Sequence, residues 1–365
     1  MIEPVVEKNL AKIAVVGIGG AGNNAINHMI EAKLTGVEFY AINTDLQALS
    51  LNLAENRIQI GAQITGGLGS GGNPELGRKA CEESLDLIKD ILTGYDMVFL
   101  AAGEGGGTGT GASPLIAEVA KTQGAIVIAV VTKPFEFEGK HRMRQALLGI
   151  RELKDKVDTL IVIPNQRLLT TYAQISCFEA FRLADDVLLN AVKGISDLIT
   201  QPGIINIDFA DVRNVMLEKG SAFISTGIAS GEGRATEAAH RAIASPLIED
   251  INIETARKIL LNIAGDERMT LQEVNEAASI VYNATNGYAE IRFGAVKDHS
   301  LKDAMRVTVI ATGIEEALPK ITDVCDLLES QDLFPVRPRI HKKDDKIVID
   351  KTNLEIPTFI RRQID

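Results

Sequence analysis

The stretch Gly103-Glu104-Gly105-Gly106-Gly107-Thr108-Gly109-Thr110-Gly111 places six glycines among nine residues, directly after the apolar run 97–102. Each glycine costs conformational entropy on folding, so a buried strand has no packing reason to end this way and something must approach the backbone. Residues 112–123 have the pattern of an amphipathic helix. A glycine loop between a strand and a helix directs backbone N–H groups into one concavity, where anions bind. The stretch therefore predicts a phosphate-binding loop rather than a flexible linker.

The loop lacks the lysine of a Walker A motif, because no lysine lies between Asp96 and Lys121. We therefore expect phosphate charge to be met by backbone N–H groups, by hydroxyls such as those of Thr108 and Thr110, and by a metal ion.

The composition is that of a globular protein long enough for two domains. Its 365 residues are 45% hydrophobic and 24% charged. A formal net charge of −11 argues against nucleic acid as a partner, because duplex binding depends on basic patches. Three distant cysteines have no metal-ligand spacing. No apolar run reaches the ~18 residues of a membrane span, so we expect a cytoplasmic protein without direct membrane insertion.

A second glycine loop, Gly17-Ile18-Gly19-Gly20-Ala21-Gly22, separates the expected strand 12–17 from the expected helix 23–32. It satisfies the GxGxxG pattern of dinucleotide-binding folds. In those folds an acidic residue closes the next strand, whereas the strand 37–42 is followed here by Asn43. This difference weakens the case for a nicotinamide-dependent oxidoreductase without excluding that function. Asp45, directly before the expected helix 46–51, can be explained by ordinary N-cap chemistry.

The third glycine loop spans residues 66–72 and ends in Asn73-Pro74, which predicts the start of a helix over residues 75–92. Further on, Glu138 and Arg142 are four residues apart, which predicts one helix face and, by spacing alone, a surface ion pair. Asn165 follows the expected strand 158–164.

Residues 178–200 have the periodicity of one long, largely buried helix, which we expect to join two domains. Near its start Phe181 and Asp185 share a face. A carboxylate can accept from N1 and N2 of guanine, adenine offers no such donors, and an aromatic ring can stack on the base, so the pair favours GTP over ATP. Beyond the helix, Asp208 and Asp211 lie three residues apart, which by itself suggests helix capping.

These strings together resemble the tubulin/FtsZ superfamily of GTPases: GGGTGTG at 105–111, Asn-Thr-Asp at 43–45, the glycine loop 66–74, Pro-Phe-x-x-Glu-Gly-x-x-Arg at 134–142, and Asn-x-Asp-Phe-Ala-Asp at 206–211. The resemblance covers the whole chain. It implies a self-assembling cytoskeletal GTPase of the cytokinetic ring, with GTP/GDP and Mg²⁺ as cofactors and no metal ligand assigned to the protein itself. It also implies the nucleotide-binding residues Gly19, Gly20, Ala21, Asn24, Asn43, Asp45, Gly71, Gly72, Gly105, Gly106, Gly107, Thr108, Gly109, Glu138, Arg142, Asn165, Phe181 and Asp185.

The resemblance further makes Asn206, Asp208 and Asp211 the catalytic loop. These residues follow the far end of the long helix, so the neighbouring chain of a head-to-tail polymer must supply them. Three positions depart from the family pattern: Gly66 replaces a common basic residue, Ser70 an alanine, and Glu104 an apolar residue. They leave open a hydrolysis-impaired, GTP-binding filament scaffold.

The fold expected from these features is α/β. It comprises a Rossmann-like GTP-binding domain with a parallel sheet (1–176), a long central helix (177–202), a second, smaller α/β domain (203–314), a charge-rich linker (315–353) and a terminal peptide (354–365) in a disordered tail. By resemblance, the peptide binds membrane-anchoring and regulatory division proteins, which places the chain at the division site on the inner face of the membrane. Its expected contact residues are Ile356, Pro357, Phe359, Ile360 and Arg361.

Overall fold

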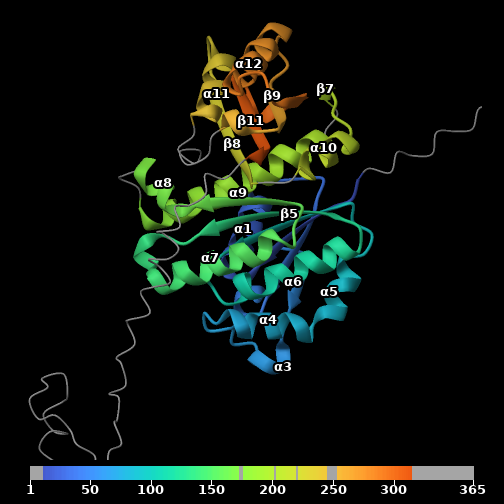
Figure 1. Ribbon diagram of the computed structural model, residues 1–365, viewed down its shortest axis with the longest axis vertical. Coiled ribbons are helices and arrows are strands. Elements are labelled where there is room, and N and C mark those ends of the chain that lie inside the picture. Colours follow the sequence, from blue (N-terminus) through green and yellow to red (C-terminus); the bar gives the residue numbers. More distant parts are fainter. Residues whose placement is uncertain (1–10, 172–175, 201–202, 219–220, 245–252, 315–365) are drawn as a thin grey trace, which may run out of the picture. The chain divides into compact units, whose positions relative to one another are not determined.

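The computed structural model describes residues 11–171, 176–200, 203–218, 221–244 and 253–314. The predicted linker 315–353 and terminal peptide 354–365, with its five contact residues, lie outside these ranges. Figure 1 follows the described elements from the N-terminal strand to the last strand of the sheet.

Six strands of the N-terminal half pair in parallel, in the order β3-β2-β1-β4-β5-β6. They are β1 (Ile13–Ile18), β2 (Glu38–Asn43), β3 (Asn56–Gln59), β4 (Met97–Gly103), β5 (Ile126–Lys133) and β6 (Thr159–Pro164). This is the order of doubly wound nucleotide-binding sheets. Their carboxyl ends share one edge, and the winding reverses between β1 and β4, where such sheets bind ligands.

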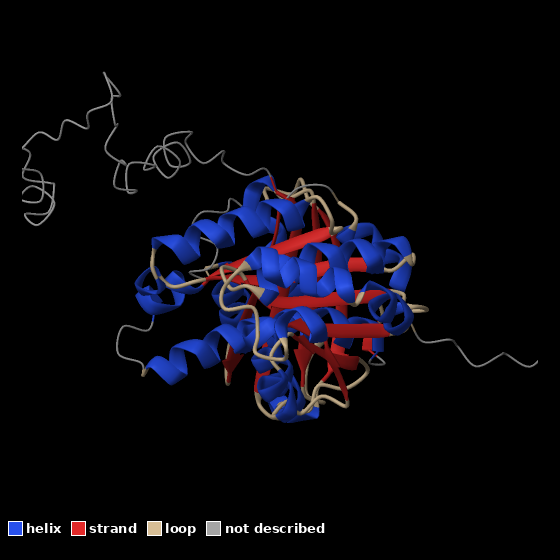
Figure 2. Ribbon diagram, turned by 90° about the horizontal axis from the view of Figure 1, so that it is seen from below, coloured by secondary structure: helices blue, strands red, loops and turns tan. Residues whose placement is uncertain are grey.

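Helices cover both faces of this sheet (Figure 2). Ile13 and Val15 of β1 pack in a core with α1 and α9, whereas Ala14 and Val16 pack with α4, α5 and α6 on the opposite face. Two-sided burial explains why these strands are continuous apolar runs. The helices of this half are α1 (Gly19–Glu31), α2 (Leu46–Ser50), α3 (Ala62–Thr65), α4 (Pro74–Glu83), α5 (Leu85–Leu92), α6 (Thr108–Thr122), α7 (Lys140–Lys154) and α8 (Asn165–Thr171), with the 3₁₀ turn η1 (Glu136–Glu138).

The C-terminal half continues the sheet in the order β8-β11-β9-β10-β7, joined to β6 through the pair Ile161–Ala222. Its strands are mixed in direction and enclose a separate core with α11 and α12. The elements are β7 (Gly203–Ile205), α10 (Phe209–Met216), β8 (Ser221–Ser230), α11 (Arg234–Ile243), η3 (Ile253–Thr255), β9 (Lys258–Gly265), α12 (Leu271–Ala284), β10 (Glu290–Lys297), η4 (His299–Leu301) and β11 (Ala304–Ile314).

The predicted long helix is α9 (Cys177–Thr200). It packs on α1 and β5 and also on β8, β9 and β10. The apolar residues that recur at helical spacing in this helix are buried at Leu188, Ala191, Ile195 and Leu198. Phe181 has the same spacing, but 44% of its surface is exposed.

Several predicted helix boundaries were wrong. The helix expected over 75–92 is two helices that break at Ser84, whose Oγ accepts a hydrogen bond from Gly61 N (3.2 Å). Helices α1 and α6 begin at Gly19 and Thr108, four residues earlier than predicted. Glu138 lies in the turn η1 rather than on α7, although its contact with Arg142 is formed.

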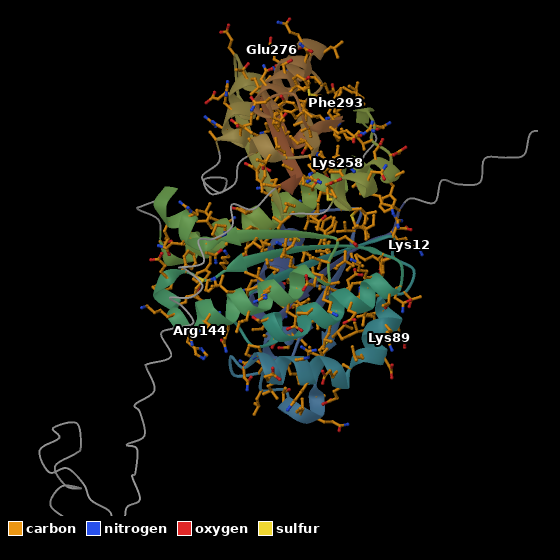
Figure 3. All side chains as sticks on the ribbon, viewed as in Figure 1. Lys12, Lys89, Arg144, Lys258, Glu276 and Phe293 are labelled. Carbon is orange, nitrogen blue, oxygen red and sulfur yellow. The ribbon has the colours of Figure 1, made fainter. Side chains whose placement is uncertain are left out.

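Polar contacts of Lys258, which is labelled in Figure 3, fix α10 on the C-terminal sheet. Lys258 Nζ donates to Asn214 O (3.0 Å) and pairs with Glu218 Oε2 (2.9 Å). The segment that carries Asp208 and Asp211 is thereby attached to the sheet. Within the described residues, no helix has the length and apolarity needed to cross a membrane.

The close crossing of α4 and α6 generates a stability prediction. A Cβ on Gly111 would lie 2.0 Å from Pro74 O, whereas nothing lies within 4 Å of a Cβ on Gly20, in α1. Gly111→Ala should therefore lower the free energy of unfolding by at least about 2 kcal/mol, and Gly20→Ala should not lower it. Urea unfolding of both variants makes the comparison, and an unchanged midpoint for Gly111→Ala would show that the crossing tolerates a methyl group.

Candidate functional site

Two helices begin at the switch point of the sheet without side-chain caps. The N-cap residues of α1 and α6 are Ile18 and Gly107, and neither offers a capping side chain. By contrast, Asp45 caps α2 and Asn73 caps α4. The first N–H groups of α1 and α6 therefore remain available, with the positive ends of both helix dipoles, to an anionic ligand.

The glycines of the three loops divide into two groups. Gly107, Gly109 and Gly111 are required by the protein's own packing, since a Cβ would lie 2.2 Å from Ser70 Oγ, 2.8 Å from Gly103 O and 2.0 Å from Pro74 O, respectively. The expectation that packing gives no reason for glycines in the stretch 103–111 was therefore wrong in part. A second group faces open space, where a Cβ would have no atom closer than 3.9 Å: Gly20, Gly66, Gly71, Gly72 and Gly106, of which all but Gly66 line the cavity described below. These positions leave the backbone accessible to a ligand.

The open glycines other than Gly66 line a cavity of about 620 Å³, here called the phosphate cradle. The predicted nucleotide-binding residues that line it are Gly19, Gly20, Ala21, Asn43, Asp45, Gly71, Gly72, Gly105, Gly106, Gly107, Thr108, Gly109 and Arg142. Sequence reasoning missed His141 and Gln145 of α7, which also line it, and Gln145 Nε2 donates to Gly72 O (3.3 Å). No pattern in the sequence marked them, because their approach to the loops is a tertiary contact.

Three hydroxyls connect the loops of the cradle. Thr108 Oγ1 lies 2.7 Å from Thr44 Oγ1 and 3.0 Å from Ser70 Oγ. The sequence singled out Thr108 and the Ser70 departure but not the link between them. Thr110, predicted to meet phosphate, instead accepts a hydrogen bond from Gly105 N (2.8 Å) and is absent from the cradle lining. It stabilises the loop.

A smaller cavity of about 70 Å³, here called the base pocket, adjoins the cradle through Ala21, Gly103 and Arg142, which line both. It collects the remaining predicted nucleotide residues: Asn24, Glu138, Asn165, Phe181 and Asp185. Four elements far apart in the sequence, α1, η1, α8 and α9, thus meet at one place.

Aromatic packing places the Phe181 ring at the base pocket. The buried ring of Phe135 meets Phe181 edge to face, with centroids 5.2 Å apart, and stacks on Phe137 at 5.1 Å. The N–H of Phe135 also donates to Glu138 Oε1 (2.8 Å), and Glu138 Oε2 pairs with Arg142 Nη1 (3.0 Å). Phe135 therefore holds both the ring and the carboxylate of the pocket.

Two polar groups of the base pocket suit a ligand with N–H donors. Asn165 is buried, and its Oδ1 has no hydrogen-bond partner among the described residues. Burial raises the pKa of Asp185 to about 7, while the charge of His28 opposes the shift and that of Asp186 adds to it. A ligand that donates hydrogen bonds to Asp185 would favour its ionised form.

The predicted catalytic residues line neither cavity. Asn206 Oδ1 accepts from Gly203 N (2.7 Å), Asp208 Oδ1 caps α10 by accepting from Asp211 N (2.7 Å), and Asp211 lies 3.5 Å from Arg292 Nε. They follow the C-terminal end of α9, and the helix from Asp185 to Thr200 spans about 22 Å.

Glu104 points away from the cradle. Its carboxyl lies beside Gly149 of α7, where a Cβ would be 2.4 Å from Oε2. The departure of Glu104 from the family pattern therefore directs no carboxylate at the cradle, where it would repel phosphate. The described residues also contain no group of three or more His, Cys, Asp or Glu side chains that could hold a metal ion.

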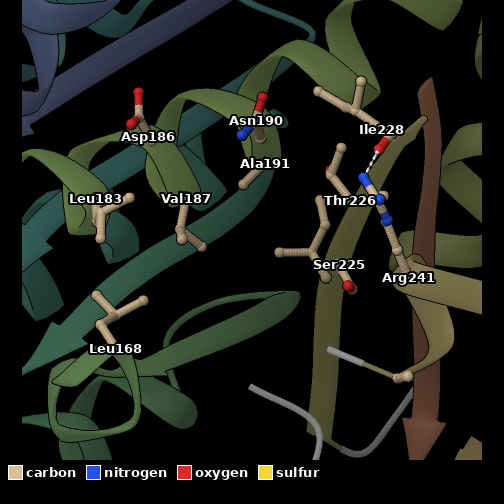
Figure 4. A pocket seen from close by; sticks show the side chains of 13 residues that line it. Leu168, Leu183, Asp186, Val187, Asn190, Ala191, Ser225, Thr226, Ile228 and Arg241 are labelled. Carbon is tan, nitrogen blue, oxygen red and sulfur yellow. Dashed lines mark hydrogen bonds between the residues drawn. The ribbon is translucent and has the colours of Figure 1, made fainter. Parts of the chain in front are cut away.

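A larger cavity of about 730 Å³ lies elsewhere, between α9 and β8 (Figure 4). Leu168, Val187 and Ile224 are among its lining residues, and Arg241 Nη1 donates to Ile228 O at one side. None of the predicted site residues lines it. Size alone therefore does not identify the functional site.

The switch-point loops, the uncapped helices and the two adjoining cavities define a nucleotide-binding protein of the doubly wound α/β class. Comparison with known proteins narrows this class. Residues 12–173 match the model of the tubulin/FtsZ family GTPase domain, and residues 220–315 match that of the FtsZ family C-terminal domain.

Relatives and solved structures agree with these matches. The chain is 46% identical to the cell division proteins FtsZ of two strains of Buchnera aphidicola, from Acyrthosiphon pisum and Schizaphis graminum, over the full length of both partners. An empty FtsZ dimer from M. jannaschii is 44% identical with a TM-score of 0.80, covering 84% of this chain and 89% of that one. CetZ1 from Haloferax volcanii, bound to GDP, shares the fold at 21% identity and a TM-score of 0.75, covering 88% of this chain and all of that one.

The chain belongs to the tubulin/FtsZ family and is a cytoskeletal GTPase of cell division that binds guanine nucleotide. None of these findings favours a nicotinamide-dependent oxidoreductase or a hydrolysis-impaired scaffold.

The base pocket generates a specificity prediction. If Asp185 accepts from N1 and N2 of guanine, the chain should bind GDP about tenfold more tightly than IDP, which lacks the 2-amino group. Asp185→Ala should reduce this preference to less than about twofold. The control Phe181→Leu should weaken both nucleotides and keep the ratio. Competition against a fluorescent GDP analogue measures the affinities of all three proteins for both nucleotides, and an unchanged ratio in Asp185→Ala would remove Asp185 from base recognition.

Proposed function

We propose that the chain hydrolyses GTP at the interface between head-to-tail subunits, with the nucleotide bound by one subunit and the catalytic loop supplied by the next. The observation that carries the proposal is the separation of the two halves of the site. The cradle and base pocket lie at the carboxyl edge of the parallel strands, whereas Asn206, Asp208 and Asp211 lie beyond the opposite end of α9.

The triphosphate would lie in the cradle, with its oxygens bound by the free N–H groups of α1 and α6 and by the open glycines Gly20, Gly71, Gly72 and Gly106. The base would enter the second cavity between Phe181, Asn165 and Asp185. Glu138 and Arg142 lie where the two cavities meet, a position suited to the ribose.

Mg²⁺ fits a cradle of this kind. The cradle lining offers the buried hydroxyls of Thr44, Ser70 and Thr108 and a single carboxylate, that of Asp45, which caps α2, so the cradle offers no carboxylate cage. Mg²⁺ in nucleotide sites is commonly held by phosphate oxygens and several waters, and it would neutralise charge that develops on the γ-phosphate.

The catalytic loop is arranged to act on a neighbour. Asn206 and Asp208 are exposed, and the contact of Asp211 with Arg292 holds the Asp211 carboxylate at the same surface. Docked against the γ-phosphate of the adjacent subunit, these groups would orient a water molecule and polarise it for attack. Turnover would then require assembly.

Exposed apolar side chains at both ends support such an interface. Leu68, which forms a β-bridge with Asp45 beside the cradle, is 89% exposed, and Leu46, the residue after Asp45, is exposed as well. Ile204, just before the catalytic loop, is 71% exposed. Large apolar residues in contact with water are typical of association surfaces. Two different patches that pair head to tail give a heterologous interface, which generates a filament when it does not close.

The predicted domain division follows from this function. We assign GTP binding to 1–176, coupling to the central helix 177–202, and activation of the neighbour's nucleotide to 203–314. The linker 315–353 would connect the filament to the peptide 354–365. Through that peptide, membrane-anchoring proteins would hold the filament at the division site on the inner face of the membrane.

Mixing two inactive variants tests the shared site. Asp211→Ala should bind GTP without hydrolysing it, and Gly106→Glu should lose GTP because its carboxylate enters the cradle. Neither alone should release phosphate. An equimolar mixture should recover up to about a quarter of wild-type activity, the fraction of random head-to-tail interfaces that pair two intact halves. A mixture as inactive as its parents, although both co-sediment in filaments, would contradict a site shared between subunits.

Deletion of residues 354–365 tests the role of the terminal peptide. The truncated chain should assemble and hydrolyse GTP like the full chain, because the described residues that line the two cavities all lie between Ile18 and Leu188. In cells it should lose its position at the division site. Retained localisation, followed by fluorescence of a tagged chain, would remove the peptide from membrane anchoring.

A further inference from the structure

Glu104 is a buried carboxyl group that the proposed mechanism does not use. It follows β4 at the start of the glycine loop, and only 2% of its surface is exposed. Its backbone N–H donates to Thr132 O (2.9 Å), which fixes the residue on β5. Neither carboxyl oxygen has a hydrogen-bond partner within the described part of the chain.

Among the described residues, no cation pairs with this carboxyl. On α6, the Thr110 hydroxyl is adjacent, and its Oγ1 accepts from Gly105 N. On α7, Gly149 leaves the space that the carboxyl fills, and Glu152 adds a negative charge that is itself paired with Arg78 of α4 (2.6 Å). His141 and Arg142 of α7 line the cradle.

Desolvation is the main reason that the pKa of Glu104 rises to about 7. The negative charge of Glu152 adds to the shift, and the nearby Thr110 hydroxyl opposes it. A neutral acid can occupy this apolar space at much lower cost than a carboxylate.

We propose that Glu104 takes up a proton when guanine nucleotide binds, so that nucleotide affinity is coupled to pH through a residue behind the phosphate loop. The inference rests on the phosphate cradle proposed above. Gly103, Gly105, Gly106 and Gly107 line the cradle on one side of the loop, and the Glu104 carboxyl lies behind the same loop, beside Gly149. Glu104 is also among the residues that line the base pocket, together with the charged residues Glu138, Arg142 and Asp185. Bound phosphates bring several negative charges to the far side of a single layer of backbone. Their field disfavours the carboxylate further.

The sign follows from linkage. If the bound state holds the Glu104 proton more tightly than the free state, raising the pH between the two pKa values weakens binding. For a difference of one pKa unit, the dissociation constant contributed by this group rises about sixfold from pH 6.5 to 8.5. Asp185 and the nucleotide phosphates also titrate in this range, so the comparison must remove their contributions.

Calorimetry of the full chain with GDP makes this comparison. Binding is measured at pH 7.5 in two buffers of different ionisation enthalpy, for wild type and for Glu104→Gln, which keeps the shape and removes the charge. Titration of Asp185 and of GDP is common to both proteins and cancels in the difference. Wild type should take up about half a proton more per GDP than the variant. Its affinity should also fall about sixfold more between pH 6.5 and 8.5.

Equal proton uptake by wild type and Glu104→Gln, with normal GDP binding, would overturn the role of Glu104 and leave the cradle intact. Failure of wild type to bind GDP would overturn the cradle itself and this inference with it. If Glu104→Gln does not fold, Glu104→Met gives the same comparison with an uncharged side chain of similar length.

Discussion

The structure depends on two helices that begin, uncapped, at neighbouring positions on one sheet edge. Helix α1 follows β1 and α6 follows β4, and the winding of the sheet reverses between these strands. The unsatisfied N–H groups of both helices therefore face one cavity. The absence of a phosphate-binding lysine becomes intelligible here, because backbone groups and two helix dipoles supply the positive potential. Close packing of α4 on α6, permitted by Gly77 and Gly111, holds this geometry.

Helix α9 extends the influence of the site across the chain. Its first turns contribute Phe181 and Asp185 to the base pocket, its middle packs in the core of the parallel sheet, and its end leads into the catalytic loop. Because Leu188, Ala191 and Ile195 are buried among both halves, the helix cannot shift without repacking them. It is therefore suited to transmit nucleotide state between the two ends of a subunit.

Local patterns were sufficient for much of this account. Apolar runs predicted the strands, and helical spacing predicted the burial of α9. The nucleotide-binding residues implied by the family resemblance all line one of the two cavities. The errors arose where tertiary contacts decide. Helix starts were placed too late because glycine has low helix propensity, yet Gly109 and Gly111 are helical where neighbouring backbones approach. Thr110 and Glu104 do not line the cradle, whereas His141 and Gln145 do. Both outcomes depend on the packing of α6 against α7, which no single stretch of sequence encodes.

The central claim is that hydrolysis needs two subunits, and the dependence of specific activity on protein concentration tests it most directly. Phosphate release and light scattering would be followed together with GTP and Mg²⁺ over a wide range of protein concentrations. The account predicts negligible specific activity below a threshold concentration, a rise above it that coincides with assembly, and loss of activity in Asp211→Ala while GTP still binds. Phosphate release that is linear in protein from the lowest concentration would mean that each subunit is a complete enzyme, and would contradict the account.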